Sequence, residues 1–405
     1  MTFTRRVRTG VASFALALLA CVALPSTSAL AVVNGTDTVG DRVIGSNAAL
    51  RRSAPDLACP AGILETADGT VLWARDADGP RAMASTTKIM TAVVVLERAR
   101  LDDVVTVRRS ASRIGESGVG LRAGERITVR DLLEAMLIHS GNDAAEALAE
   151  HVAGSSEAFV RLMDEKADQL DLRNTRYTNP HGLDEPGHHT SAEDLAALAR
   201  YAMRDPEFRR IVASVSATMP APGGGARRLE TSNLLLGQYQ GLIGVKTGWT
   251  NEAGYCLVSA ARRDGVELYG VVLGARSEGS RFRQTVALLD WGFEHYRWRQ
   301  VTTEGVVVGS VAARDWVDVS IPARVSESTA VPVFDLAGRV GTRVSLPDGV
   351  DSPVALGRRL GTLTVSQGDR LLVQVPIEAA RQVERPTWAQ KIWFAMVRSW
   401  RAVAR

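Results

Sequence analysis

Lysine is rare in this chain, and its placement indicates where chemistry takes place. Only four of the 48 basic residues are lysines, and arginine fills the other positions. Arginine stays protonated, whereas a lysine shielded from water can lose its proton and act as a base. Two of the lysines lie in distinctive contexts, Ser85-Thr86-Thr87-Lys88 and Lys246-Thr247-Gly248. We therefore expect Lys88 and Lys246 to take part in chemistry.

The pair Ser85 and Lys88 has the spacing of a nucleophile and its base. On a helix, residues three apart lie on one face, one turn from each other. A serine hydroxyl is a poor nucleophile until a base takes its proton, and burial of Lys88 beside another cation would lower its pKa enough for that role. Backbone N–H groups at a helix start also favour developing negative charge. Because Ser-x-x-Lys also occurs on ordinary helix surfaces, the motif needs support from elsewhere in the chain.

Two further motifs supply that support. Ser140-Gly141-Asn142 begins a predicted helix, where Ser140 or Asn142 could serve only as the N-cap. Lys246-Thr247-Gly248 stands at the end of a short predicted strand, where Gly248 removes a side chain and lets a substrate backbone approach. The order S-x-x-K, S-x-N, K-T-G, with separations of about 50 and 100 residues, is the signature of penicillin-recognising enzymes with an active-site serine.

The motifs and the sequence around them resemble low-molecular-mass penicillin-binding proteins, the serine-type D-alanyl-D-alanine carboxypeptidases of peptidase family S11. The resemblance runs from about residue 55 to the C-terminus. Its matching segments are SGNDAAEALAEHVAGS, NTRYTNPHGLD at 174–184, VKTGWTNEAGYCLVSAARRDG, ALGRRLGTLTV and VPIEAARQVE. It implies an α+β fold: a penicillin-recognising (β-lactamase-like) serine transferase domain with an antiparallel sheet and a helical block, then a small all-β domain and a C-terminal amphipathic helix. No cofactor and no metal are implied.

The reaction implied by the resemblance removes the terminal D-alanine from peptidoglycan stem pentapeptides, and β-lactams acylate the same serine. Ser85 attacks the carbonyl between the last two D-alanines and forms an acyl-enzyme, while Lys88 takes the Ser85 proton. Ser140 relays a proton toward the leaving amine, and Asn142 holds the substrate amide and the lysine pair. Water then releases the shortened peptide.

The resemblance also implies a set of substrate-binding residues. Lys246 keeps the field positive and, with Thr247, meets the substrate carboxylate. Backbone N–H groups of Ser85 and Trp249 would form the oxyanion hole. The predicted substrate-binding residues are Lys246, Thr247, Gly248, Trp249 and Arg281. Arg276 also matches an arginine near the family's site.

The hydrophobic pattern by itself predicts an α+β layer fold. Two strand-like runs in residues 62–73 flank Asp68-Gly69, which predicts a hairpin. Predicted helices cover 85–98, 129–138, 143–152, 157–170 and 192–203. Strands return at 244–246, 255–261 and 268–273, and an amphipathic segment follows at 281–296. Strands at both ends of a helical block indicate that the terminal strands pair.

We expect five segments along the chain. They are a signal peptide at 1–31, a linker at 32–54, the catalytic domain at 55–297, an all-β domain at 298–384 and an amphipathic membrane-anchoring helix at 385–405. The all-β segment shows short alternating runs separated by Gly, Asp and Pro and carries no visible chemistry. We interpret it as a spacer that lifts the catalytic domain off the membrane.

The N-terminus has the pattern of a secretion signal. Arg5, Arg6 and Arg8 precede an apolar run at 11–24 that is too short to span a bilayer comfortably, and Ala29-Leu30-Ala31 supplies the cleavage pattern. Lipidation at Cys21 is the alternative, although apolar residues continue after it. The pattern predicts an exported protein at the outer face of the cytoplasmic membrane, in the cell envelope.

Charge and cysteine content narrow the partners. The net charge of +3 becomes 3 − 3 = 0 without the three arginines of residues 1–31, so nothing favours nucleic acid as a partner. Cys59 and Cys256 remain after processing. A disulfide between them and two buried thiols are both compatible with the sequence.

The C-terminal segment separates into two faces at helical spacing. The apolar face holds Trp388, Ile392, Met396, Trp400 and Val403, and the opposite face holds Lys391, Arg398, Arg401 and Arg405, with Phe394 as its one large apolar residue. Three of the chain's eight tryptophans lie here, and every charge is cationic. This combination favours a helix in the headgroup region of an anionic membrane over a helix packed on its own protein.

Three other functions are compatible with parts of the sequence. A class A-like β-lactamase shares the three motifs, but we find no E-x-x-L-N segment between Asn142 and Lys246 for its water-activating carboxylate. A metal hydrolase could use His181, His188 and His189 near acidic residues, but their spacing fits no H-E-x-x-H pattern. A slow-turnover protein that binds β-lactams or cell wall is the third, and the intact motifs argue against it.

Overall fold

The computed structural model describes residues 53–403. The predicted signal peptide at 1–31, its alternative lipidation residue Cys21 and nearly all of the predicted linker at 32–54 lie outside the described residues.

A five-stranded antiparallel sheet forms the centre of the N-terminal region, with strand order β2-β1-β9-β8-β7. Its strands are β1 Ala61–Thr66, β2 Val71–Arg75, β7 Leu242–Thr250, β8 Gly254–Arg263 and β9 Val266–Ala275. The predicted hairpin joins β1 to β2, and Gly69 lies in its turn with φ of 82°. β1 also pairs with β9, which confirms that strands from the two ends of the helical block pair. β7 is an edge strand.

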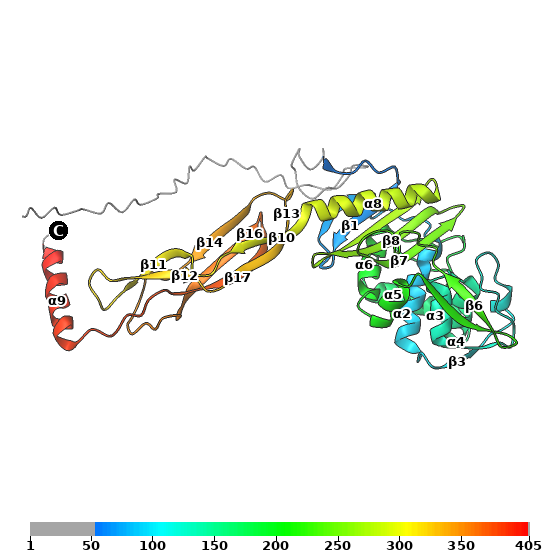
Figure 1. Ribbon diagram of the computed structural model, residues 1–405, viewed down its shortest axis with the longest axis horizontal. Coiled ribbons are helices and arrows are strands. Elements are labelled where there is room, and N and C mark those ends of the chain that lie inside the picture. Colours follow the sequence, from blue (N-terminus) through cyan, green and yellow to red (C-terminus); the bar gives the residue numbers. More distant parts are fainter. Residues whose placement is uncertain (1–52, 404–405) are drawn as a thin grey trace, which may run out of the picture. The chain divides into compact units, whose positions relative to one another are not determined.

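Helices cover both faces of this sheet (Figure 1). Because successive side chains in a strand point to opposite faces, Ile63 and Val271 face a block of helices while Leu64 and Val272 face α8. The block contains α2 Lys88–Arg98, α3 Val129–Leu137, α4 Asn142–Ala153, α5 Ser156–Gln169, α6 Ala192–Ala202 and α7 Pro206–Val212, and α8 is Glu278–His295. The predicted α+β fold is confirmed.

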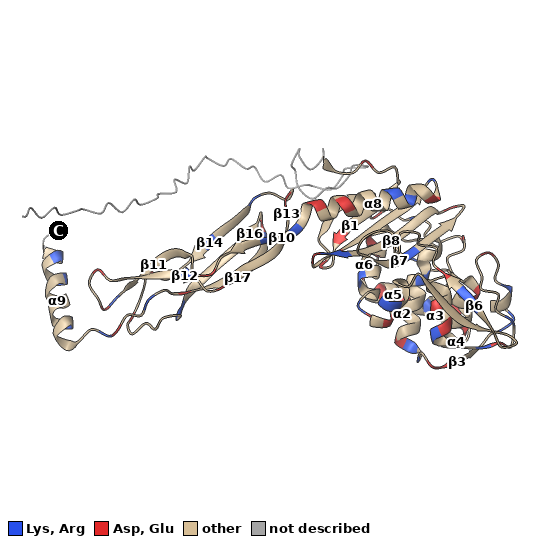
Figure 2. Ribbon diagram, in the orientation of Figure 1, with Lys and Arg blue, Asp and Glu red and all other residues tan. Residues whose placement is uncertain are grey.

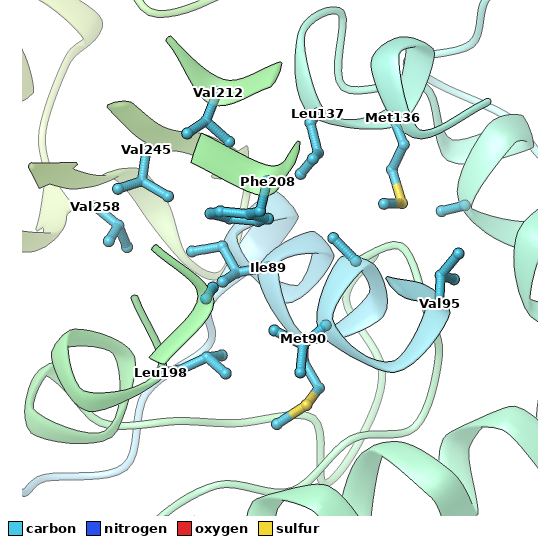
Figure 3. Close-up of a cluster of buried hydrophobic side chains, with 14 of the residues drawn as sticks. Ile89, Met90, Val95, Met136, Leu137, Leu198, Phe208, Val212, Val245 and Val258 are labelled. Carbon is cyan, nitrogen blue, oxygen red and sulfur yellow. The ribbon is translucent and has the colours of Figure 1, made fainter. Parts of the chain in front are cut away.

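The helix that follows the S-x-x-K serine lies at the centre of the core. α2 carries no charge between Lys88 and Glu97, and its residues from Lys88 to Val95 are all buried. In Figure 3 its Ile89 lies beside Phe208, with Val245 and Val258 of the sheet close by. Burying one such side chain stabilises the fold by about 1.5–3 kcal/mol, so this packing fixes the helix that carries Lys88.

The structure contains two hairpins that the hydrophobic pattern did not predict. They pair β3 Val104–Thr106 with β4 Arg126–Thr128, and β5 Ser216–Ala221 with β6 Gly225–Glu230. Both are short and mostly exposed, so they lack a continuous apolar stripe. Gly223 and Gly224, both with positive φ, form the turn of the second hairpin.

The region that follows α8 is built from strands, as predicted. β10 Tyr296–Thr302 pairs with β13 Thr329–Phe334 in a small sheet. The larger sheet contains β11 Val307–Ala313, β12 Ser320–Val325, β14 Val340–Ser345, β15 Gly349–Val350, β16 Arg359–Gln367 and β17 Arg370–Ala379. Its own core includes Val311, Ile321, Val365, Val375 and Ile377.

The predicted C-terminal helix is α9, Trp388–Val403, and its two faces differ as the sequence indicates. On the polar face, Arg401 pairs with Asp318 at 2.7 Å, and the Phe394 and Trp316 rings lie 5.4 Å apart. The apolar face is exposed at Trp388, Ile392, Trp393, Met396, Trp400 and Val403. Figure 2 shows cationic and no acidic positions along α9. Among the described residues, no helix combines the length and the apolar character needed to cross a membrane.

Candidate active site

Ser85 lies in a 3-10 turn, η1 Ala84–Thr87, that leads directly into α2. The Thr86 hydroxyl donates to the Met83 carbonyl at 2.7 Å, and the Thr87 hydroxyl donates to the Ala84 carbonyl at 2.8 Å. These bonds close the turn and present the Ser85 side chain to a cleft. As the spacing predicted, the Lys88 Nζ lies 2.8 Å from the Ser85 Oγ.

Lys88 is completely buried, and its amine has three oxygen neighbours. They are the Ser85 Oγ, the Asn142 Oδ1 at 2.7 Å and the His181 carbonyl oxygen. Burial, reinforced by the charge of Lys246, holds the pKa of Lys88 well below its usual range. A neutral amine has two N–H donors and one lone pair. Donation to Asn142 and His181 therefore leaves the lone pair for the Ser85 proton.

The S-x-N motif lines the same cleft as Ser85, which lies in the turn η1 (called the nucleophile turn below), and its Asn142 contacts Lys88. Gly141 is the N-cap of α4, so the interpretation of Ser140 or Asn142 as a simple N-cap is wrong. Ser140 has φ of 72°, a conformation that L-residues with a side chain rarely adopt. Such strain persists only where surrounding contacts hold it, and it concentrates at functional sites.

The K-T-G motif lies within the nine-residue strand β7, which corrects the expectation that it ends a short strand. Lys246 is 1% exposed, and burial together with the Arg281 charge lowers the pKa of Lys246 to about 7. The hydroxyl of Thr247 lies 2.5 Å from that of Ser232, a residue outside the three motifs.

Gly248 packs closely against the nucleophile turn. A Cβ at Gly248 would stand 3.0 Å from the Ser85 backbone nitrogen and 3.2 Å from the Met83 carbonyl oxygen. The missing side chain therefore lets the nucleophile turn pack against β7. Access for a substrate backbone stays a prediction.

Of the two arginines matched by resemblance, Arg281 lines the cleft and Arg276 does not. Arg281, on α8, is 4% exposed and donates to the Gly248 carbonyl at 3.1 Å. Its Nε is buried without a hydrogen-bond partner among the described residues. Arg276 is exposed and lines a neighbouring groove.

The cleft has a volume of about 520 Å³ and is lined by Ser85, Glu116, Ser117, His139, Ser140, Asn142, Gly182, Leu183, Ser232, Thr247, Gly248, Trp249, Thr250, Asn251 and Arg281. Seven of the predicted residues are in this lining, and the two lysines lie beneath it. Glu116 and Ser232 were missed because they belong to no motif with fixed spacing. Only the fold brings them to the cleft.

Of the three clustered histidines, the His188 side chain contacts the nucleophile turn. The Thr178 backbone N–H donates to the His188 Nδ1 at 3.0 Å, so the ring proton lies on Nε2, 2.8 Å from the Thr87 Oγ1. Burial lowers the pKa of His188 to about 4, which keeps the ring neutral. Within residues 53–403, no group of three or more His, Cys, Asp or Glu side chains could hold a metal ion.

The two cysteines of the described region, Cys59 and Cys256, are both buried and are not joined by a disulfide. Of the two open alternatives, the structure contains the buried thiols. Burial raises the pKa of Cys256 to about 11, so its thiol stays protonated.

Comparisons with known proteins identify the family. The family described as D-alanyl-D-alanine carboxypeptidase (peptidase S11) matches residues 49–277, more than half of the chain. The chain belongs to this family. The family match extends across all three motifs, which supports the resemblance seen in the sequence.

Relatives in this family match most of the chain. D-alanyl-D-alanine carboxypeptidase DacC of Escherichia coli is 32% identical over 363 residues, covering 85% of this chain and 89% of the relative. DacF of Bacillus subtilis is 30% identical over 332 residues, covering 80% and 85%.

Two solved structures resemble this chain over different lengths. The Streptomyces K15 DD-transpeptidase is 34% identical with a TM-score of 0.57 and covers 59% of this chain and 98% of its own. Penicillin-binding protein 5 of Haemophilus influenzae is 27% identical with a TM-score of 0.61, covering 82% and 99%. Penicillin-binding protein 5 therefore matches a larger share of this chain than the K15 enzyme does.

Proposed function

We propose that this protein is a serine-type D-Ala-D-Ala carboxypeptidase that removes the terminal D-alanine from peptidoglycan stem pentapeptides and is acylated by β-lactams. The observation that carries the proposal is the fully buried Lys88 amine, with a strongly lowered pKa, 2.8 Å from the Ser85 hydroxyl. This arrangement supplies a base to a serine nucleophile at neutral pH. The names of the family relatives support the substrate class.

Acylation begins with transfer of the Ser85 proton to the Lys88 lone pair as the Oγ attacks the carbonyl between the two D-alanines. The carbonyl becomes an oxyanion, which the N–H groups of Ser85 and Trp249 stabilise. A proton then passes through Ser140 to the leaving amine, the C–N bond breaks and D-alanine departs. Water attacks the ester, and Ser85 regains its proton as the shortened peptide leaves.

The substrate carboxylate is held by the groups at the K-T-G end of the cleft. The Thr247 hydroxyl and Arg281 provide donors, and the orphaned Arg281 Nε supports an anion at this place. Lys246 adds positive charge from below. The Ser232 Oγ lies 2.5 Å from the Thr247 Oγ1, and a hydrogen bond between the two hydroxyls would hold the Thr247 side chain in place for the carboxylate.

The peptide itself lies extended along β7. An edge strand has one row of backbone N–H and C=O groups free of its own sheet, and an extended peptide can pair with it as an added strand. This pairing holds the scissile carbonyl beside Ser85, because η1 packs against β7 at Gly248.

The decisive experiment measures D-alanine release by the purified mature protein from a pentapeptide that ends in D-Ala-D-Ala, with Ser85→Ala as the control. Release that disappears in the control supports the carboxypeptidase and its nucleophile together. A folded protein that releases no D-alanine but is acylated by a penicillin, as shown by intact mass, would contradict the proposal and favour a β-lactam-binding protein.

We propose further that the mature protein is exported and held at the outer face of the cytoplasmic membrane by α9. The apolar face of α9 is exposed along its length, whereas its polar face contacts the all-β region through Arg401 and Phe394. The basic and apolar pattern of residues 1–31 supports export.

The domain boundaries near 55, 297 and 384 are also a proposal. α8 ends at His295, strands alone occupy Tyr296 to Ala379, and α9 begins at Trp388. The strands pack around a core of their own, which supports a separate all-β domain.

A further inference from the structure

A second groove opens beside the catalytic cleft, at one end of the strands of the five-stranded sheet. It has a volume of about 530 Å³ and shares Trp249, Thr250 and Asn251 with the cleft. Strand register explains its position, because Trp249 pairs with Tyr255 and Tyr255 pairs with the residue directly before Arg276. The ends of β7 and β9 therefore lie beside the start of β8 at this end of the sheet. Groove and cleft are therefore neighbours that share the end of β7 and the residue after it.

The groove combines an aromatic wall with two cations. Trp249 is 49% exposed, and its ring centroid lies 5.8 Å from that of Tyr255. Pro60, Pro80 and Ala82 add apolar surface, and the charged residues of the lining are Arg81, Arg276 and Glu252. This composition suits an organic molecule that carries both apolar and anionic groups.

The two arginines have unused donors. Arg276 is exposed and makes no ion pair or side-chain hydrogen bond with any residue of the described range. Arg81 pairs with Asp76, but its Nε is buried without a partner in that same range. Glu252 pairs with neither arginine. Arg276 is therefore the arginine of the groove whose guanidinium is open to an anion, whereas the Arg81 guanidinium already pairs with Asp76.

The position of the substrate carboxylate on β7 determines which residues of a bound peptide reach the groove. A peptide whose terminal carboxylate lies at Thr247 and which runs along β7 passes Trp249 and arrives at Asn251. The four residue steps from Thr247 to Asn251 span about 13 Å, and four residue steps of an extended substrate peptide span the same distance. The second and third residues of a pentapeptide therefore lie at the groove when the fourth is at Ser85.

We propose that this groove binds the upstream part of the peptide substrate and that Arg276, with Arg81 beside it, pairs with a carboxylate on the second or third residue. This inference rests on the proposed function, because it assumes a peptide that ends in D-Ala-D-Ala at Ser85. It makes Arg276 a residue that determines specificity: it selects peptides that are acidic upstream of the scissile bond.

The test uses two pairs of pentapeptides ending in D-Ala-D-Ala, each pair differing only by a carboxylate or a carboxamide, at the second residue in one pair and at the third in the other. We expect the wild type to prefer the carboxylate form of at least one pair by about 3–10-fold in kcat/KM, mainly through KM. Arg276→Gln should reduce that ratio to one, and Arg276→Lys should restore part of it. The matched control is Arg126→Gln, an exposed arginine on β4 that makes no ion pair with another described residue and should keep the wild-type ratio.

The wild type is also assayed with a short N-acyl-D-Ala-D-Ala and for acylation by a penicillin. Failure of both assays would overturn the proposed function itself. A wild type that turns over the short substrate but does not distinguish carboxylate from carboxamide in either pair would overturn only the groove. An Arg276→Gln variant that keeps the preference would overturn the assignment to Arg276.

Discussion

The catalytic cleft buries two lysine side chains, whereas α9 exposes apolar ones. Lys88 and Lys246 are almost inaccessible to water, although lysine is normally a surface residue. On α9, no residue is buried and Trp388 is 77% exposed. Burying a charged amine away from water costs free energy, and in the cleft this cost lowers the pKa of both lysines. On α9, the apolar side chains stay exposed to water, which is unfavourable until a membrane covers them.

The largest expected effect is on Lys88. Arginine at this position keeps the charge but cannot give up its proton, so Lys88→Arg should slow acylation by a penicillin by about 10²–10⁴-fold. The rate is followed by intact mass, and thermal unfolding checks that the variant folds. The control is Lys166→Arg. Lys166 does not line the cleft and pairs with Glu97 at a distance of 2.6 Å, so this variant should be acylated at the wild-type rate. A Lys88→Arg rate within about tenfold of the wild type would mean that another group is the base.

The next effect concerns the packing behind Ser85. A Cβ at Gly182 would stand 2.0 Å from the Ala84 carbonyl oxygen, and φ there is 91°. Gly182→Ala should therefore lower the free energy of unfolding by about 2–4 kcal/mol, measured by urea denaturation. Gly187 has a similar φ of 86°, but the nearest atom to its Cβ would be 3.9 Å away. Gly187→Ala should lower it by only about 1 kcal/mol, and equal losses would show that backbone strain alone matters.

On α9, the apolar face should control membrane binding and leave folding unaffected. Replacing Trp388, Trp393 and Trp400 together by Ser should weaken binding to anionic phospholipid vesicles by at least about 10²-fold, because a bilayer covers these side chains. The thermal midpoint should not change, since none of them is buried. Val340→Ser with Val344→Ser alters exposed apolar residues of β14 and should bind vesicles normally. Unchanged binding by the tryptophan variant would remove α9 as the anchor.

The pH dependence should separate the two buried lysines. Lys88 acts as the free base, so kcat/KM rises as pH increases through its lowered pKa. Lys246 acts when protonated, so its contribution is complete below its pKa of about 7 and is lost as pH rises through that value. Lys246→Arg should move the alkaline limb of the profile upward by more than about one pH unit, because arginine stays protonated. An alkaline limb that does not move would assign it to another group.

The smallest expected effect is on Ser232. Losing its 2.5 Å hydrogen bond to Thr247 in Ser232→Ala should raise KM by about 2–10-fold with little change in kcat, because one neutral hydrogen bond orients a binding hydroxyl. Ser232→Thr keeps the hydroxyl and should restore KM. A loss confined to kcat would instead place Ser232 in the proton-transfer steps.

The sequence by itself determined the candidate reactive groups and most of the framework that holds them. Local spacing placed Ser85 and Lys88 on one face, because residues three apart near a helix start are neighbours, and the two other motifs were needed to single this pair out. Alternation and helical periodicity also predicted the β1–β2 hairpin, the main helices and the all-β region, since each has a continuous apolar face. The short hairpins escaped prediction because they have no such face.

Only the tertiary structure decided how these groups act on one another. The Ser232 and Thr247 hydroxyls lie in contact although they are 15 positions apart in the chain. Arg281 donates to the Gly248 carbonyl from α8, on the face of the sheet opposite the helical block. The His181 carbonyl oxygen lies next to the Lys88 amine from a loop. No periodic pattern links these positions, so composition and spacing cannot indicate their contacts. The pKa values of Lys88 and Lys246 depend on burial and on charges that arrive from distant segments. Desolvation is a property of the packed fold, and for that reason the chemistry of the two lysines follows from the structure and not from their motifs alone.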